Sequence, residues 1–368
     1  MSIAFEIQLV AVITAVACAI PGAFLVLRRM ALMSDAISHT VLLGIVLAYF
    51  VVRDLASPFL IVSAAATGVL TVALVEALAR TRLVKQDAAI GLVFPALFSI
   101  AVILVSRWAG DVHLDTDAVL LGELAFAPFR RLSWGGTDLG PRALWVMGTV
   151  LVLVVAFVLA FYKELKLSTF DSALAAALGF SPALLHYAFM GLVSVTAVGA
   201  FDTVGSILVV ALMIAPPAAA YLITDSLPRL LVYSALIAAA SAISGFWLAW
   251  VADANIAGAM AAMTGVAFLL AFLFSPDRGM VALARRRAVQ RLEFAQLMLA
   301  VHLLQHEDSP DAASESAPEH LQEHLQWTPE FARRIVERAE RGRWVVRQAD
   351  RLVLTEVGRA RGAAALGE

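Results

Sequence analysis

Long apolar runs separated by short polar stretches fill the first three quarters of the sequence. An α-helix needs about 20 predominantly apolar residues to cross a bilayer, and nine runs approach that length. They occupy residues 3–27, 34–52, 56–79, 88–106, 143–162, 183–200, 203–223, 229–250 and 256–275. The division near Gly199 to Asp202 is the weakest of these assignments. The pattern predicts an all-α polytopic membrane protein with about nine transmembrane helices.

The pattern changes after residue 276, where Arg, Glu and His become frequent. Residues 285–305 are typical of an amphipathic helix, and the polar stretch "HEDSPDAASESAPEH" that follows indicates a flexible linker over 306–319. We therefore expect a membrane domain at 1–276 and a separate tail at 277–368.

The end of the tail has the signals of a helix, a hairpin and a second helix. Thr328 and Pro329 fit the start of the first helix and Gly342 its end. Two short apolar runs, 344–346 and 351–354, then predict a hairpin, and Thr355 caps the last helix. This order of elements resembles a winged helix over about 320–364, similar to those of diphtheria-toxin-repressor-like metal regulators.

Composition agrees with insertion in a membrane. Hydrophobic residues make up 61% of the chain, charged residues 15%, and the mean hydropathy is +0.85, whereas soluble domains are about half apolar and a quarter charged. The single cysteine, Cys18, lies in the first apolar run, which argues against a disulfide framework or a CxxC metal site. The N-terminus has neither a basic region nor a small-residue cleavage site, so the first run is expected to be a retained helix.

The distribution of Lys and Arg predicts the orientation, because cytoplasmic loops carry the excess of these residues. Eight basic residues follow the odd-numbered runs, whereas most of those after the even-numbered runs share one long loop. The eight are Arg28, Arg29, Arg80, Arg82, Lys85, Lys163, Lys166 and Arg229. The bias favours a multi-pass protein of the plasma or inner membrane, with an external N-terminus and a cytoplasmic tail.

Asp35 and His39 lie near the start of the second apolar run, where an ionisable group is costly. Insertion scales put the cost at about 2.5–3.5 kcal/mol for a charged residue, so such groups usually face a bundle interior or a wet cavity. The i, i+4 spacing places both on one helical face. Carboxylate oxygen with imidazole nitrogen suits Mn, Fe or Zn. The alternative is a hydrogen-bonded pair that only joins two helices.

A second interruption follows the fifth run, in "YKELKLSTFDSALAAALGFSPALLHYAF". Thr169 fits a helix cap, Asp171 favours a helix N-terminus, and Gly179 before Ser181 and Pro182 ends the helix. These signals predict a short helix of about ten residues near 169–181. A short capped helix between two spans suits docking to a partner, and its alternative is an ordinary interfacial connector.

Four blocks of the membrane domain carry a resemblance to a known family. They are, in order, "RRMALMSDAISHTVLLGIVLA", "DAAIGLVFPALFSIAVIL", "KELKLSTFDSALAAALGF" and "VGSILVVALMIAPPAAAYLIT". Together they resemble the permease subunit of the manganese/zinc/iron-type ABC importers, over nearly all of residues 1–276. The resemblance implies a type II ABC importer-like fold. It also implies a second permease copy or a paralogue, an extracytoplasmic metal-binding protein, and two copies of a separate ATPase.

The resemblance also implies roles for individual residues. Asp35 and His39 fall on the Asp and His of the family's second-helix block, which binds the metal in the translocation path, and two protomers would supply two of each. Residues 171–180 fall on the coupling helix that docks on the ATPase, with Asp171, Ala175 and Gly179 as its framework. The chain lacks a G-x-x-x-x-G-K-[ST] phosphate loop, so ATP hydrolysis is expected from the separate subunit.

Two further acidic features fall between predicted spans. Asp202, in "GAFDTVGS", could help to pass a cation or could cap the helix that follows, and the cap is the favoured interpretation. The loop "GDVHLDTD" carries Asp111, His113, Asp115 and Asp117 on the predicted outer side. Alternating acids would attract cations at an entrance, and a structural role for this loop is the favoured alternative.

The tail contains two further i, i+4 histidine pairs. They are His302 with His306 and His320 with His324. Such pairs could bind a metal from one helical face, and surface histidines beside a polar linker are the ordinary alternative. Between Glu330 and Arg361, nine Arg face five acids, a balance of +4 that is compatible with phosphate contacts. A winged helix that docks on protein is at least as consistent with a membrane-tethered domain.

Three functions are compatible with these features of the sequence. The favoured one is the permease of a binding-protein-dependent ABC importer of Mn, Zn or Fe, with no permanently bound cofactor. An ion-coupled secondary transporter would work without an ATPase and often has internal repeats, of which none is convincing here. A membrane-anchored regulator would bind metal or DNA through its tail. HExxH and nucleophile-elbow motifs are absent from the sequence, which argues against an enzyme.

Overall fold

The chain forms two compact units, Met1–Gly279 and Met280–Glu368, named here the membrane unit and the tail unit. The computed structural model describes residues 2–53, 57–108, 124–134, 137–307, 309, 316–317, 325–348 and 351–367.

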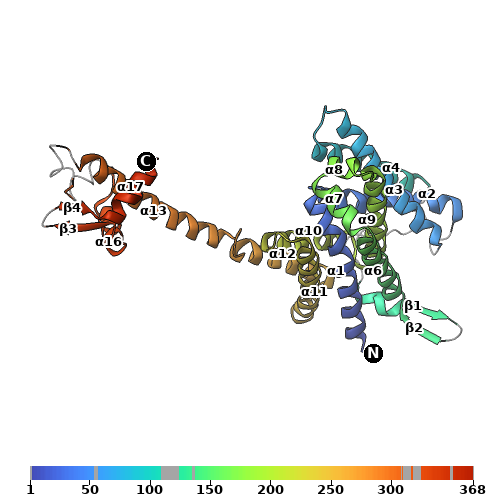
Figure 1. Ribbon diagram of the computed structural model, residues 1–368. Helices are drawn as coiled ribbons and strands as arrows, with labels where there is room; N and C mark the ends of the chain where they lie inside the picture. The colour runs from blue at the N-terminus through green and yellow to red at the C-terminus, as the bar shows by residue number, and fades with distance from the viewer. Residues whose placement is uncertain are drawn as a thin grey trace. The chain divides into compact units, whose positions relative to one another are not determined.

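The membrane unit is a bundle of long helices (Figure 1). Within the described residues, nine helices are long and apolar enough to cross a membrane. They are α1 (Ile3–Leu27), α2 (Leu32–Val52), α3 (Pro58–Arg80), α4 (Gln86–Trp108), α6 (Arg142–Ala160), α9 (Pro182–Val204), α10 (Ser206–Ile223), α11 (Leu227–Ala252) and α12 (Ile256–Phe274). This result confirms the prediction of an all-helical polytopic membrane protein.

Local chemistry explains most of the helix ends. The Ser2 side chain caps α1 and the Asn255 side chain caps α12, each by accepting a backbone N–H of the first turn. The boundary near Gly199, which the apolar pattern left weak, lies further along the chain at Gly205. Gly205 has a φ of 80°, which ends α9 and lets α10 begin at the next residue.

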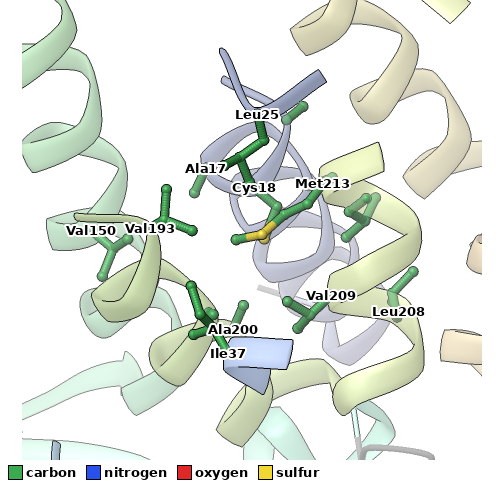
Figure 2. Close-up of a cluster of buried hydrophobic side chains, with 14 of the residues drawn as sticks. Ala17, Cys18, Leu25, Ile37, Val150, Val193, Ala200, Leu208, Val209 and Met213 are labelled. Carbon is green, nitrogen blue, oxygen red and sulfur yellow. The ribbon is translucent and has the colours of Figure 1, made fainter. Parts of the chain in front are cut away.

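The core of the membrane unit surrounds α1. Side chains from α1, α2, α6, α9 and α10 meet there, including Cys18, Ile37 and Met213 (Figure 2). Gly22 of α1 lies so close to α10 that an added Cβ would be 2.1 Å from the Met213 carbonyl oxygen. Small residues at such a contact allow the backbones of membrane helices to approach and gain dispersion energy.

The α2–α3 contact also uses small and hydroxyl side chains. Gly44 of α2 faces the backbone of α3, and Ser63 donates a hydrogen bond to the Gly44 carbonyl at 2.8 Å. Thr71 of α3 lies 2.8 Å from the hydroxyl of Thr40. These bonds join the middle of α2 to α3 and fix the rotation of α2 about its own axis.

Short elements occupy the two ends of the bundle (Figure 1). The N-terminus lies at the same end as η1 (Leu124–Phe129), β1 (Arg131–Trp134) and β2 (Thr137–Pro141), and β1 and β2 pair as an antiparallel hairpin. Two short helices, α7 (Tyr162–Phe170) and α8 (Ser172–Ala177), lie at the opposite end.

The tail unit has its own apolar core. It consists of α13 (Met280–His306), α16 (Pro329–Arg341), β3 (Val345–Gln348), β4 (Arg351–Leu354) and α17 (Glu356–Leu366), with β3 and β4 paired antiparallel. Leu299 and Leu303 of α13 pack with Ile335 and Val336 of α16 and with Leu352 of β4. The helix, hairpin and helix expected from the sequence are all present, and Thr355 caps α17 through the Gly358 N–H.

Candidate functional site

Asp35 and His39 lie side by side in the first two turns of α2. His39 Nε2 is 3.4 Å from Asp35 Oδ1, so the i, i+4 spacing does bring the two groups together. The side chain of Asp35 is 43% exposed and that of His39 is 25% exposed. Both side chains are therefore only partly covered by the bundle.

Two aromatic rings of α4 hold the imidazole. The centroid of the His39 ring is 5.3 Å from that of Phe94 and 5.9 Å from that of Phe98, with the Phe98 ring edge-on. Such offset and edge contacts restrict ring rotation. Sequence reasoning missed this support because a phenylalanine pair at i, i+4 in an apolar run looks the same as ordinary core.

The neighbouring hydroxyls on α2 are already bonded. Ser34 donates to the Ala31 carbonyl, and Ser38 and Thr40 donate to carbonyls of the preceding turn. Within the described residues, no group of three or more His, Cys, Asp or Glu side chains could hold a metal ion. Asp35 and His39 of one chain are two potential donors, which is half of the four that a tetrahedral site uses.

Asp202 and Arg130 form an exposed ion pair at the hairpin end of the bundle. Asp202 lies in the last turn of α9, 3.6 Å from Arg130, and its side chain is 73% exposed. The N-cap of α10 is Gly205, so the prediction that Asp202 caps α10 is wrong.

The four residues of the "GDVHLDTD" loop, Asp111, His113, Asp115 and Asp117, lie outside the described residues.

Arg131 ties the hairpin to α1. Its guanidinium donates to Asp138 at 2.5 Å and to Glu6 of α1 at 3.2 Å. The pKa of Asp138 is lowered by the Gly140 backbone N–H and by Arg131. The arginine is therefore a local anchor for the hairpin rather than a basic group available to a ligand.

The segment around Asp171 differs in detail from the sequence prediction. Residues 162–170 are helical as α7, so Thr169 lies inside a helix and the prediction that it is a cap is wrong. Asp171 is the cap of α8, and its Oδ1 accepts the Leu174 N–H at 2.9 Å. α8 has six residues instead of about ten, with Ala175 buried, and Gly179 follows in the left-handed region at φ 87°.

A polar cluster at the α7 end of the bundle was not found from the sequence. Glu76 of α3 lies 2.6 Å from His186 Nε2 and accepts a hydrogen bond from the Tyr187 hydroxyl at 2.8 Å. Arg28, at the end of α1, lies against the same histidine and against α7. The available signal was the presence of Glu76 and His186 in predicted spans, where ionisable groups are costly.

The tail histidines are only partly described. His302 is 6% exposed, and His306 Nδ1 lies 2.9 Å from the His302 carbonyl oxygen one turn back. His320 and His324 lie outside the described residues. Metal binding by these pairs stays a prediction.

Replacing Glu307 with Gln is expected to loosen the contact between α13 and α17 at neutral pH. Arg359 donates three hydrogen bonds of 2.6–3.0 Å to the Glu307 carboxylate and lowers its pKa. A carboxylate with a lowered folded-state pKa stabilises the fold above its unfolded pKa of about 4.3, and loses this contribution as pH falls through the folded value. For a half-exposed pair we expect about 0.5–1 kcal/mol, measured by hydrogen exchange of α17 amides in the full-length protein.

The control for this experiment is Glu293→Gln, which removes an exposed carboxylate from α13. It should leave α17 exchange unchanged. An effect of Glu307→Gln that persists below the folded pKa would show that the ion pair is not its cause.

The long apolar helices define the described part of this chain as a helical, multi-pass membrane protein. A profile of the ABC 3 transport family matches residues 2–275, and the chain belongs to that family. The match ends at Ser275, the first residue after α12, so it covers nearly all of the membrane unit.

Named relatives support this membership. The chain is 50% identical over 353 residues to the zinc transport system membrane protein TroD of Treponema pallidum (strain Nichols), with 96% of each chain covered. It is 49% identical over 279 residues to the manganese transport system membrane protein MntD of Bacillus subtilis (strain 168), which covers 75% of this chain and 94% of that one. The first match includes most of the tail unit, whereas the second is about the size of the membrane unit.

A solved structure supports the fold. PsaBC from Streptococcus pneumoniae in complex with Fab matches with a TM-score of 0.63 at 24% identity, covering 77% of this chain and 96% of that one. The fold of most of this chain is therefore shared with that solved structure.

Proposed function

We propose that this chain is the permease subunit of a binding-protein-dependent ABC importer that carries a divalent transition metal into the cytoplasm. The observation that carries the proposal is the Asp35–His39 pair on α2, 3.4 Å apart and partly open, in a chain of the ABC 3 transport family. Relatives are named for zinc, manganese and iron transport. Oxygen with imidazole nitrogen suits all three metals, so the donor set alone does not choose among them.

The metal path is proposed to need two permeases. Each chain contributes Asp35 and His39, and a second copy or a paralogue contributes the equivalent pair, which gives four ligands in total. The extracytoplasmic binding protein delivers the ion to the hairpin end of the bundle, and Asp202 is a minor candidate contact on that route. The N-terminus is then external, and the tail is cytoplasmic.

A separate ATPase is proposed to dock at α8. Asp171 caps the helix, Ala175 packs inward and Gly179 makes the turn after it, while large apolar side chains around it are exposed. The exposed side chains are Phe170, Leu174, Leu178 and Phe180. Apolar side chains gathered on a short connecting helix fit a hydrophobic groove on a partner.

Leu178→Glu combined with Leu174→Glu is expected to release the ATPase from the permease. The substitutions place two charges in an apolar interface, where unpaired charge is strongly unfavourable. The affinity for the ATPase should fall by roughly 700-fold, an estimate based on two hot-spot side chains of about 2 kcal/mol each, and co-purification should be lost. The matched control is Leu139→Glu in the hairpin at the opposite end, which should retain the ATPase. Equal retention by both variants would contradict docking at α8.

The tail is proposed to be a winged helix that docks on a protein partner. The order α13, α16, β3, β4 and α17 supports a winged helix. Several arginines of the tail already contact neighbours within it, among them Arg338 with Gln296 and Arg347 with Glu340, which favours protein docking over DNA. Salt-sensitive DNA binding by the full-length protein would support the alternative.

The function is tested by uptake of Mn²⁺, Fe²⁺ and Zn²⁺ into vesicles that contain this chain, its ATPase and its binding protein. ATP-dependent uptake is expected, and its metal preference identifies the cargo. Uptake that continues without the ATPase would support an ion-coupled secondary transporter. No uptake of any of the three metals would reject the proposed function.

A further inference from the structure

One arginine at the end of α1 contacts two other helices of the bundle, α7 and α9. Arg28 Nε donates to the Thr169 hydroxyl at 3.0 Å, and its Nη2 donates to the Ser168 hydroxyl at 3.2 Å. Its Nη1 lies 3.4 Å from His186 Nδ1, and its guanidinium lies 5.0 Å from the Phe189 ring centroid. The first two contacts are on α7 and the last two on α9.

The contacts use the planar shape of the guanidinium. An arginine presents five N–H donors in a rigid fork, whereas a lysine presents one compact ammonium. Burial lowers the pKa of Arg28 to about 10, so the side chain is still charged at neutral pH. A buried charge is retained here because hydroxyl, imidazole and aromatic partners surround it.

The network continues from His186 into α3. The Nδ1 of His186 lies 3.4 Å from Arg28 Nη1, and its Nε2 lies 2.6 Å from Glu76 Oε1. The other oxygen of Glu76 accepts from the Tyr187 hydroxyl at 2.8 Å and lies 3.4 Å from Arg80. The α1 end, α3, α7 and α9 are thus joined by one chain of polar contacts.

Arg28 also connects the segment before the proposed ATPase dock with the turn that leads into the proposed metal site. Thr169 is two residues before Asp171, the cap of α8. On its other side, Arg28 begins the tight turn into α2, in which Arg29 has a φ of 58° and the Met30 N–H bonds the Leu25 carbonyl at 2.8 Å. Asp35 follows Met30 by five residues.

We propose that Arg28 is a positioning residue that transmits movement of α7 and α8 to the start of α2, and so to Asp35 and His39. This inference rests on the proposed function, because it takes α8 as the ATPase dock. A displacement of α7 moves the hydroxyls of Ser168 and Thr169, the guanidinium follows them, and the short turn transfers the shift to α2. Without the contacts of Arg28, a flexible connection between α1 and α2 would absorb the movement of α7.

The test uses the complete complex of this chain with its ATPase and binding protein in vesicles. Arg28→Lys and the double variant Ser168→Ala with Thr169→Val are compared with the wild type. Three quantities are measured: ATP hydrolysis, Mn²⁺, Fe²⁺ and Zn²⁺ uptake per ATP, and the labelling rate of a Leu32→Cys reporter by a hydrophilic maleimide. Leu32 is the exposed first residue of α2, and the native Cys18 is fully buried.

Both variants are expected to hydrolyse ATP while uptake per ATP falls by about tenfold, within the range of typical coupling between sites. The difference in Leu32→Cys labelling between the nucleotide-free and vanadate-trapped states should largely disappear. The matched control is Arg29→Lys, one residue on, where the side chain is exposed. It should behave as the wild type.

Each other outcome is decisive. Wild-type uptake per ATP together with a wild-type labelling difference in Arg28→Lys would overturn the inference. A parallel loss of hydrolysis and uptake with the labelling difference intact would assign Arg28 a purely structural role and also overturn it. A wild-type complex that shows the Arg28-dependent labelling difference and transports none of the metals would reject the proposed function and keep the mechanical link.

Discussion

Asp35→Asn and His39→Ala are each expected to abolish ATP-driven metal uptake while the permease still assembles and its ATPase still hydrolyses ATP. Asn keeps the shape of Asp but loses the negative charge that a divalent ion requires, and Ala removes the imidazole nitrogen. Changes to groups that only support a metal ligand cost about 10–100-fold in affinity or activity, so loss of a direct ligand should cost at least about 100-fold. The measurement is uptake of Mn²⁺, Fe²⁺ and Zn²⁺ into vesicles at equal amounts of assembled complex.

The matched control for Asp35→Asn is Asp87→Asn. Asp87 is an exposed carboxylate in the first turn of α4, and Asp35 likewise lies in the first turn of α2. Its substitution should leave uptake within about twofold of the wild type, since surface changes usually have small effects. Undiminished uptake by Asp35→Asn and His39→Ala would show that the pair only stabilises helix packing, and the metal route would then be unassigned.

Gly22→Val is expected to prevent stable folding of the membrane unit. An added Cβ would lie 2.1 Å from the Met213 carbonyl oxygen and 2.8 Å from its carbonyl carbon. Both are backbone atoms of α10, so a change of side-chain rotamer cannot relieve the overlap, and α1 and α10 must separate. Overpacking typically costs about 1–3 kcal/mol, and a backbone contact in a close-packed core should lie at the upper end of this range or above it.

The measurement is the yield of monodisperse protein in detergent and its unfolding temperature. Gly148→Ala in α6 is the control, because an added Cβ there meets nothing within 4 Å. Alanine is favoured over glycine in a helix by about 1 kcal/mol, so this variant should be as stable as the wild type or more stable. Normal yield and unfolding temperature for Gly22→Val would contradict the close approach of α1 and α10.

Most of the helices could be predicted from the sequence, because insertion in a bilayer depends on a property that is local in the chain. A run of about 20 apolar residues satisfies its own backbone hydrogen bonds as a helix, whatever its neighbours do. Helix ends depend on shorter signals. The prediction that Asp171 starts a helix was correct. The prediction that Thr169 caps a helix was wrong, because its hydroxyl accepts a hydrogen bond from Arg28 of another element.

The sequence by itself determined that this protein crosses the membrane, that a polar tail follows, and that Asp35 and His39 share one face of a helix. These properties depend on composition and on the 3.6-residue period alone. Only the tertiary structure decided that Phe94 and Phe98 flank His39 and that Arg28 meets residues 141 and 158 positions further along. Apolar faces of membrane helices are nearly equivalent in sequence, so the partner of each face is selected by close packing and by polar contacts between distant segments.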